Sequence, residues 1–159
     1  MLCSAAAWLV AALVALQISA PASVLALFGG GMLIYPASVL VCKLLGRSGK
    51  HAKANPLGPL AIENTLWLVF CLPIAYAVSK FNILWFFPSM LLIIGGRYLT
   101  FRTLYGVRVY WVCGAALAVA AYLLAALKLQ PAAAAFTGAA IETVFAVIIL
   151  IGHRRAAEG

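Results

Sequence analysis

The stretch "LLIIGGRYLTFRTLYGVRVYW", residues 91–111, begins as an apolar run and then takes up three arginines. Charged residues make up only 9% of the chain, so this change of character is informative. A helix that crosses a bilayer needs about 20 predominantly apolar residues, and basic residues gather where such a helix leaves the hydrocarbon. The stretch is therefore typical of the end of one membrane-spanning helix and the beginning of the next.

The composition of the whole chain supports the same interpretation. The chain has 159 residues, of which 67% are hydrophobic, and its mean hydropathy is +1.13. A soluble domain of this length could not bury so much apolar surface, so the solvent must be lipid. The net charge of +8 comes from basic residues that cluster between apolar runs, without a basic helix or interleaved aromatic residues. This pattern favours membrane lipids over nucleic acid as the partner.

Six apolar runs, separated by turn-forming residues, each have about the length of a membrane-spanning helix. They are too long for strands and lack an alternation of apolar and polar residues. We therefore predict an all-α, polytopic transmembrane helix bundle that forms a single domain over residues 1–159. Pro88 and the Gly95–Gly96 pair predict a kink or an early end in the fourth helix. The predicted helices lie at about residues 2–18, 24–45, 57–78, 83–98, 107–129 and 132–151.

The basic residues predict the orientation of the bundle. Lys80 and Lys128 are the two basic residues on one side of the predicted membrane, and the other nine of the 11 lie on the opposite side. Positive charge accumulates in cytoplasmic loops, so both termini and the two long basic connections are predicted to be cytoplasmic. Long basic side chains at helix ends also reach lipid headgroups. The residues expected to anchor headgroups in this way are Lys50, Lys53, Arg102 and Arg108.

Two carboxylates lie within apolar runs, Glu63 in "LAIENTLWLVF" and Glu142 in "GAAIETVFAVI". A charged residue at a helix centre costs about 2.5–3.5 kcal/mol, so it normally faces the bundle interior and has a partner or a function. At a rise of about 1.5 Å per residue, Glu63 lies about 9 Å and Glu142 about 15 Å from the start of its predicted helix. Arg97 lies at a depth similar to that of Glu63. An ion pair between Glu63 and Arg97 is therefore the simplest arrangement.

That pairing leaves Glu142 without an obvious cationic partner, and two states are open for it. It could be protonated, because removal from water disfavours the charged form, or it could bond Thr137, Thr143 or tyrosine hydroxyl groups. Gly138, one turn earlier, would let a neighbouring backbone approach. A carboxylate at the midplane beside small residues occurs in proton- or cation-coupled carriers and also in purely structural bundles.

Signatures of catalysis or of metal binding are missing from the sequence. It contains no G-x-S-x-G, H-E-x-x-H or P-loop motif, and its three acidic residues are too few for an acidic metal-dependent transferase site. The four cysteines are scattered through apolar segments without C-x-x-C spacing. We therefore expect neither an enzyme nor a metal ion or cofactor, although an intramembrane enzyme that uses Glu142 and Arg97 stays open.

Three stretches resemble a family of small, uncharacterised bacterial inner-membrane proteins that is known as a domain of unknown function. They are "GGGMLIYP" at 29–36, "NPLGPL" at 55–60 and "GGRYLTFRTLYG" at 95–106. The resemblance implies a multi-pass protein of the bacterial cytoplasmic membrane, and it brings no activity, ligand or residue role. The first apolar run begins at Met1 itself, which is consistent with a shortened N-terminus.

The leading hypothesis is a carrier or channel for a small solute or ion. The candidate ligand- or ion-binding residues are Glu63, Asn64, Arg97, Glu142 and Thr143. The alternative is a structural or assembly subunit that binds lipid or partner membrane proteins. A chain this small often needs a second copy to enclose a pathway, so a homo-oligomer or a partner membrane protein is expected. Access of water to Glu142 would distinguish the two functions.

Overall fold

The computed structural model describes residues 1–44 and 58–158. In this part of the chain it has six α-helices, one short 3₁₀-helix and no strand, which confirms the predicted all-α class. The helices are α1 (Leu2–Gln17), α2 (Ala20–Leu44), α3 (Gly58–Phe81), η1 (Ile83–Trp85), α4 (Phe86–Tyr105), α5 (Val109–Ala126) and α6 (Pro131–Glu158).

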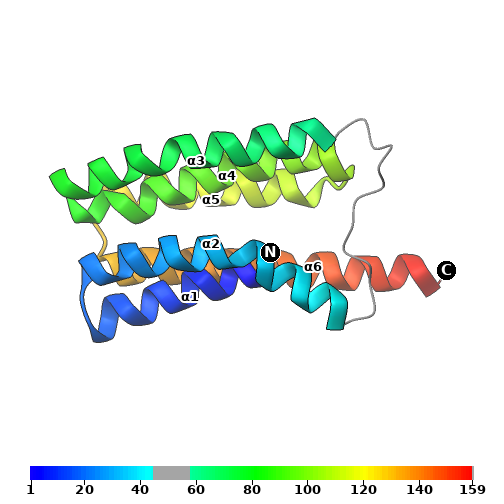
Figure 1. Ribbon diagram of the computed structural model, residues 1–159, viewed down its shortest axis with the longest axis horizontal. Coiled ribbons are helices and arrows are strands. Elements are labelled where there is room, and N and C mark those ends of the chain that lie inside the picture. Colours follow the sequence, from blue (N-terminus) through cyan, green and yellow to red (C-terminus); the bar gives the residue numbers. More distant parts are fainter. Residues whose placement is uncertain (45–57, 159) are drawn as a thin grey trace.

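The helices form two layers, in which consecutive helices run in opposite directions (Figure 1). One layer contains α3, α4 and α5, and the other contains α1, α2 and α6. Within the layers, α4 packs most closely on α5, and α1 packs closely on both α2 and α6. Contacts of α5 and α4 with α6 join the two layers. The start of α1 lies about half-way along α6 (Figure 1).

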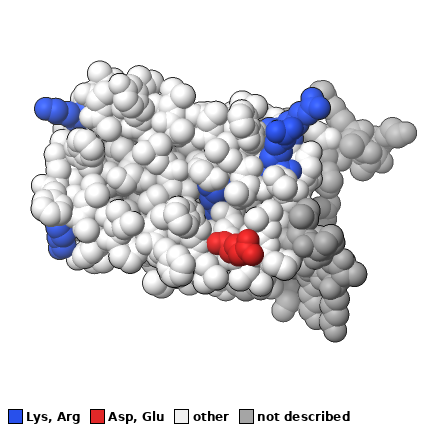
Figure 2. Space-filling model, turned by 90° about the horizontal axis from the view of Figure 1, so that it is seen from above, with Lys and Arg blue, Asp and Glu red and all other residues white. Residues whose placement is uncertain are grey.

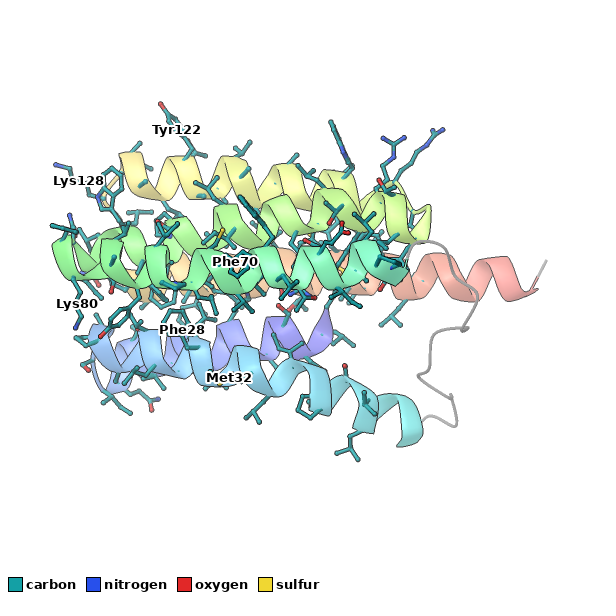
Figure 3. The ribbon with its side chains drawn as sticks, turned by 45° about the horizontal axis from the view of Figure 1, so that its top comes forward. Phe28, Met32, Phe70, Lys80, Tyr122 and Lys128 are labelled. Atoms are coloured by element: carbon teal, nitrogen blue, oxygen red, sulfur yellow. The ribbon has the colours of Figure 1, made fainter. Side chains whose placement is uncertain are left out.

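The exposed surface identifies the chain as a membrane protein. Within residues 1–44 and 58–158, four helical segments are long and apolar enough to cross a bilayer: Pro59–Phe81, Ile83–Tyr105, Val109–Ala126 and Pro131–Gly152. Two shorter apolar helical segments, Leu2–Gln17 and Ala20–Ile34, accompany them. Large apolar side chains project outward along the bundle, and Tyr122 is an example (Figure 3). Water does not tolerate so extensive an apolar surface, whereas lipid does.

The two ends of the bundle differ in their basic residues. Lys80 and Lys128 lie at the same end (Figure 3), as the sequence predicts. Arg102 and Arg108 lie at the other end, because α4 ends at Tyr105 and α5 begins at Val109. Which end faces the cytoplasm stays a prediction.

The prediction that the fourth helix ends early, at Gly95–Gly96, is wrong. The helix α4 continues through this pair to Tyr105 and ends at Gly106, which takes the left-handed conformation with φ 70°. A Cβ atom on Gly95 would lie 2.9 Å from the carbonyl oxygen of Gly114, so this glycine allows α4 and α5 to approach closely. Pro88 falls in the first turn of α4, where no helical hydrogen bond is lost.

The other predicted helix bounds agree with the structure to within a few residues, except at the end of α6. This helix continues past residue 151 to Glu158.

Aromatic side chains fill the core between the layers. Phe86 and Phe87 of α4 are fully buried and meet edge to face, with ring centroids 5.0 Å apart. Phe28 of α2 packs on Phe86 at 5.4 Å, and Trp8 of α1 lies 6.0 Å from Phe87. Aromatic side chains of both layers thus pack against one another in the core.

Candidate functional site

Glu142 lies in the middle of α6, and its side chain is completely buried. Its Oε1 accepts a hydrogen bond of 3.1 Å from the Tyr98 hydroxyl group on α4. Its Oε2 has no hydrogen-bond partner. The bond to Tyr98 therefore joins the two layers at a polar point within an apolar core, and it satisfies only half of the carboxyl group.

Trp8 of α1 supplies a second unpaired atom next to this carboxyl group. The indole is fully buried, and its Nε1 has no hydrogen-bond partner. The ring lies against Gly138, because a Cβ atom there would come within 2.8 Å of Trp8 Cδ2. Ser4 and Trp8 both lie close enough to Glu142 to interact with its charge. A buried donor and a buried acceptor thus lie near each other, with no hydrogen bond of standard geometry between them.

These contacts settle several expectations about Glu142. The Tyr98 hydroxyl group donates a hydrogen bond to Glu142, which confirms the predicted alternative of a tyrosine partner. Thr137 and Thr143 do not, because their hydroxyl groups donate to the backbone oxygens of Ala133 (2.9 Å) and Ala139 (2.7 Å) on the same helix. Gly138 makes room for an indole ring, where a neighbouring backbone was expected.

Arg97 is half-buried on α4, one residue before Tyr98. Its Nη2 donates to Thr65 Oγ1 on α3 at 3.5 Å, and its guanidinium lies over the Phe101 ring at 5.4 Å. Its Nε has no hydrogen-bond partner. Among the ionisable groups that act on Arg97, Glu142 has a smaller effect than Tyr98 and Tyr105, and the Arg97 and Glu142 side chains make no ion pair.

The expected ion pair between Glu63 and Arg97 is wrong. Within the described residues, Glu63 is exposed and makes no ion pair. Asn64 faces α4 and donates from Nδ2 to the Arg97 carbonyl oxygen at 3.4 Å. One residue turns a helix by about 100°, so Glu63 and Thr65 lie on opposite sides of Asn64. Arg97 reaches the side of Thr65, and Glu63 faces away from it.

The other side of Asn64 holds an open hollow of about 360 Å³ between α3 and α4. Glu63 lines it together with Asn64, Trp67, Gly96 and Thr100. Seen from the layer that contains α3, the described part of the surface is uncharged apart from basic groups at both ends and one acidic and one basic patch between them (Figure 2). The predicted polar cluster is therefore divided: Glu142 lies in the core, Arg97 lies on the Thr65 side of Asn64, and Glu63 lies on the other side.

A cluster of rings connects the buried site to the end of the bundle. Tyr98 stacks on Tyr110 with centroids 6.1 Å apart and meets Phe101 edge to face at 5.5 Å. Tyr105 contacts both Phe101 (5.6 Å) and Tyr110 (5.7 Å), and it is half exposed at the end of α4. The phenol groups thus extend from Glu142 to the surface.

The sequence analysis missed Trp8 and Tyr98 as site residues. The available signal was that an indole N–H or a phenol in an apolar helix needs a hydrogen-bond partner. Of the predicted headgroup anchors, Arg102 and Arg108 are exposed at one end of the bundle, and Lys50 and Lys53 lie outside the described residues. In the described part of the chain, His, Cys, Asp and Glu side chains do not gather in groups of three or more.

Comparison with known proteins gives a family and no activity. No curated protein and no solved structure matches the chain. The model of a family of unknown function (DUF7010) matches residues 1–152. The resemblance predicted from the sequence to a family without an assigned function is thereby confirmed, and the chain belongs to this family of unknown function.

Proposed function

We propose that this membrane protein is a carrier for a small solute or ion, and that Glu142 binds a proton or a small cation during transport. The observation that carries the proposal is a fully buried carboxyl group with one oxygen lacking a partner. An ionised carboxylate at this depth costs about 2.5–3.5 kcal/mol. A proton or a cation at Oε2 would remove that cost, and its release would restore it.

The position of Glu142 at the layer boundary suits such a cycle. Glu142 belongs to the layer of α1, α2 and α6, whereas Tyr98 belongs to the layer of α3, α4 and α5. Many carriers work by rocking two helix groups around a site near the midplane. Movement of the layers apart would break the 3.1 Å bond and open Glu142 to water. The structure would then correspond to a closed state, in which the rings exclude water.

Arg97 gives the cycle an electrostatic component. Its guanidinium interacts with the charge of Glu142 and has a free Nε. When the carboxyl group loses its proton or cation, its attraction to Arg97 grows, although the two side chains make no ion pair in this state. The loaded site lacks this attraction. Loading and unloading of Glu142 would therefore change the balance of forces across the layer boundary.

The proposal is tested with purified protein in lipid vesicles that contain a pH-sensitive dye. Under an imposed pH gradient and membrane potential, wild-type vesicles are expected to dissipate the gradient faster than empty ones, with protons or a monovalent cation as the carried ion. Glu142→Gln keeps the shape of the side chain but removes its ionisation, so this variant should fall to the level of empty vesicles.

Glu158→Gln is the matched control, because it removes a carboxylate beyond the candidate span that ends at Gly152. This variant should behave as the wild type. The carrier proposal fails if Glu142→Gln, eluting as a folded protein on size-exclusion chromatography, dissipates the gradient as fast as the wild type. It fails equally if wild-type vesicles match empty vesicles with protons, Na⁺ and K⁺.

A further inference from the structure

The outer seam between α3 and α4 carries two hollows. The first is the 360 Å³ hollow at one end of the seam, where Glu63, Asn64 and Thr100 add polar groups to a largely apolar lining. The second has about 210 Å³ and an almost entirely apolar lining, which includes Cys71, Ile74 and Val78 of α3. Both hollows open to the outside of the bundle, so a ligand can reach them directly from the surrounding lipid.

The two hollows lie along one continuous stripe of α3. The lining positions on this helix are 60, 63, 64, 67, 71, 74, 75 and 78, which recur every three or four residues. Such positions share one face of a helix. On the antiparallel α4, the lining positions run in the reverse order, 100, 96, 93, 92 and 89. The seam is thus polar at Glu63 and apolar toward Val78.

The polar end offers hydrogen-bond acceptors and an aromatic face. Glu63 has an exposed carboxylate, and Trp67, one turn later, is 65% exposed. The Asn64 amide and the Thr100 hydroxyl both donate to the Arg97 carbonyl oxygen, which leaves Asn64 Oδ1 and the Thr100 oxygen as acceptors. A carboxylate beside an indole suits a cation, through charge and cation–π attraction. A primary ammonium group, with three N–H donors, fits this set best.

The seam is longer than one leaflet of a bilayer. Glu63 lies about 7 Å along the helix axis from Gly58, which is close to the thickness of an interfacial layer. Val78 lies about 22 Å further along the axis, beyond the roughly 15 Å of hydrocarbon in one leaflet. A headgroup amine at Glu63 therefore leaves room for an acyl chain to lie along the apolar part of the seam.

We infer that this seam binds an aminophospholipid, with its ammonium group on Glu63 and Trp67 and an acyl chain along the second hollow. The Glu63 carboxylate has no ion-pair partner within the described residues, because Arg97 donates to Thr65 on the opposite side of Asn64. A charged lipid amine neutralises Glu63 without a partner protein. The phosphate stays in the headgroup layer, because a short linker separates it from the amine. This binding site is separate from Glu142 and does not depend on transport.

Native mass spectrometry of the detergent-purified protein tests the inference. The probes are phosphatidylethanolamine and phosphatidylcholine with identical acyl chains, which differ in the N–H donors of the amine. The wild type is expected to retain phosphatidylethanolamine at least about tenfold more strongly, a ratio equivalent to about 1.4 kcal/mol. Glu63→Gln should abolish this preference while retaining the acyl-chain contribution. Glu158→Gln is the matched control and should keep the full preference.

Three results would overturn the inference. The first is equal retention of the two lipids by the wild type, and the second is a preference that survives in Glu63→Gln. The third is a wild-type dimer that Glu63→Gln converts to monomer without any lipid preference, since a second copy would then occupy the seam. The proton-flux assay separates this site from the carrier proposal, because Glu142→Gln should leave the lipid preference unchanged.

Discussion

Replacement of Tyr98 by phenylalanine removes the hydrogen bond that links the two layers at Glu142. The variant keeps the ring, with its contacts to Phe101 at 5.5 Å and Tyr110 at 6.1 Å, and loses only the 3.1 Å bond. Both carboxyl oxygens are then buried without a partner. A hydrogen bond contributes about 0.5–1.5 kcal/mol between neutral groups and about 1.5–3 kcal/mol when one partner is charged. The amount by which Tyr98→Phe lowers the free energy of unfolding therefore reports whether Glu142 is charged.

We expect Tyr98→Phe to lower the free energy of unfolding by about 1.5–3 kcal/mol at alkaline pH and by about 0.5–1.5 kcal/mol at acidic pH. The loss shrinks as pH falls, because a protonated carboxyl group accepts a weaker bond. The assay is unfolding by a denaturing detergent in mixed micelles, followed by circular dichroism at both pH values. A double-mutant cycle with Glu142→Leu, which removes the acceptor oxygen, should show that the two losses are not additive.

Tyr122→Phe is the matched control for this prediction. Tyr122 is 73% exposed and points away from α5 into the surroundings (Figure 3), so loss of its hydroxyl group should change stability by less than about 0.5 kcal/mol. Additive losses for Tyr98 and Glu142, or a Tyr98→Phe variant as stable as the control, would refute the bond. A loss that is the same at both pH values would instead refute ionisation of Glu142.

Two further predictions concern packing and topology. Gly114→Ala would place a Cβ atom 2.6 Å from the Gly95 carbonyl oxygen and should destabilise the protein by about 1–3 kcal/mol. Gly96→Ala meets open space and should stabilise the protein by up to about 1 kcal/mol. Equal effects of the two variants in the same unfolding assay would disprove the close approach of α4 and α5. The orientation can be tested with Lys50→Cys and Arg154→Cys in a background without native cysteines. Both cysteines should react with a membrane-permeant thiol reagent added outside cells and should not react with an impermeant one. Reaction with the impermeant reagent at either position would overturn the predicted orientation.

The predicted ion pair between Glu63 and Arg97 shows that a similar depth in the membrane is not enough to predict a contact. Glu63 and Arg97 have similar predicted depths, yet their side chains leave α3 and α4 on opposite sides of Asn64. Depth follows from counting residues at about 1.5 Å each, whereas the direction of a side chain changes by about 100° from one residue to the next. A helix rotation of that size decides whether two charges meet, and packing fixes it.

The sequence by itself determined that the chain is a membrane protein built of six helices, and it placed most of the basic residues near the helix ends. These properties are local, because apolar length and the positions of Gly, Pro and basic residues act within one segment. Only the tertiary structure decided that Tyr98 bonds Glu142, that Trp8 fills the space at Gly138, and that Gly95 packs against α5 without breaking its helix. Those contacts join segments far apart in sequence, and an apolar helix surface without a strong polar face does not specify which neighbour it meets.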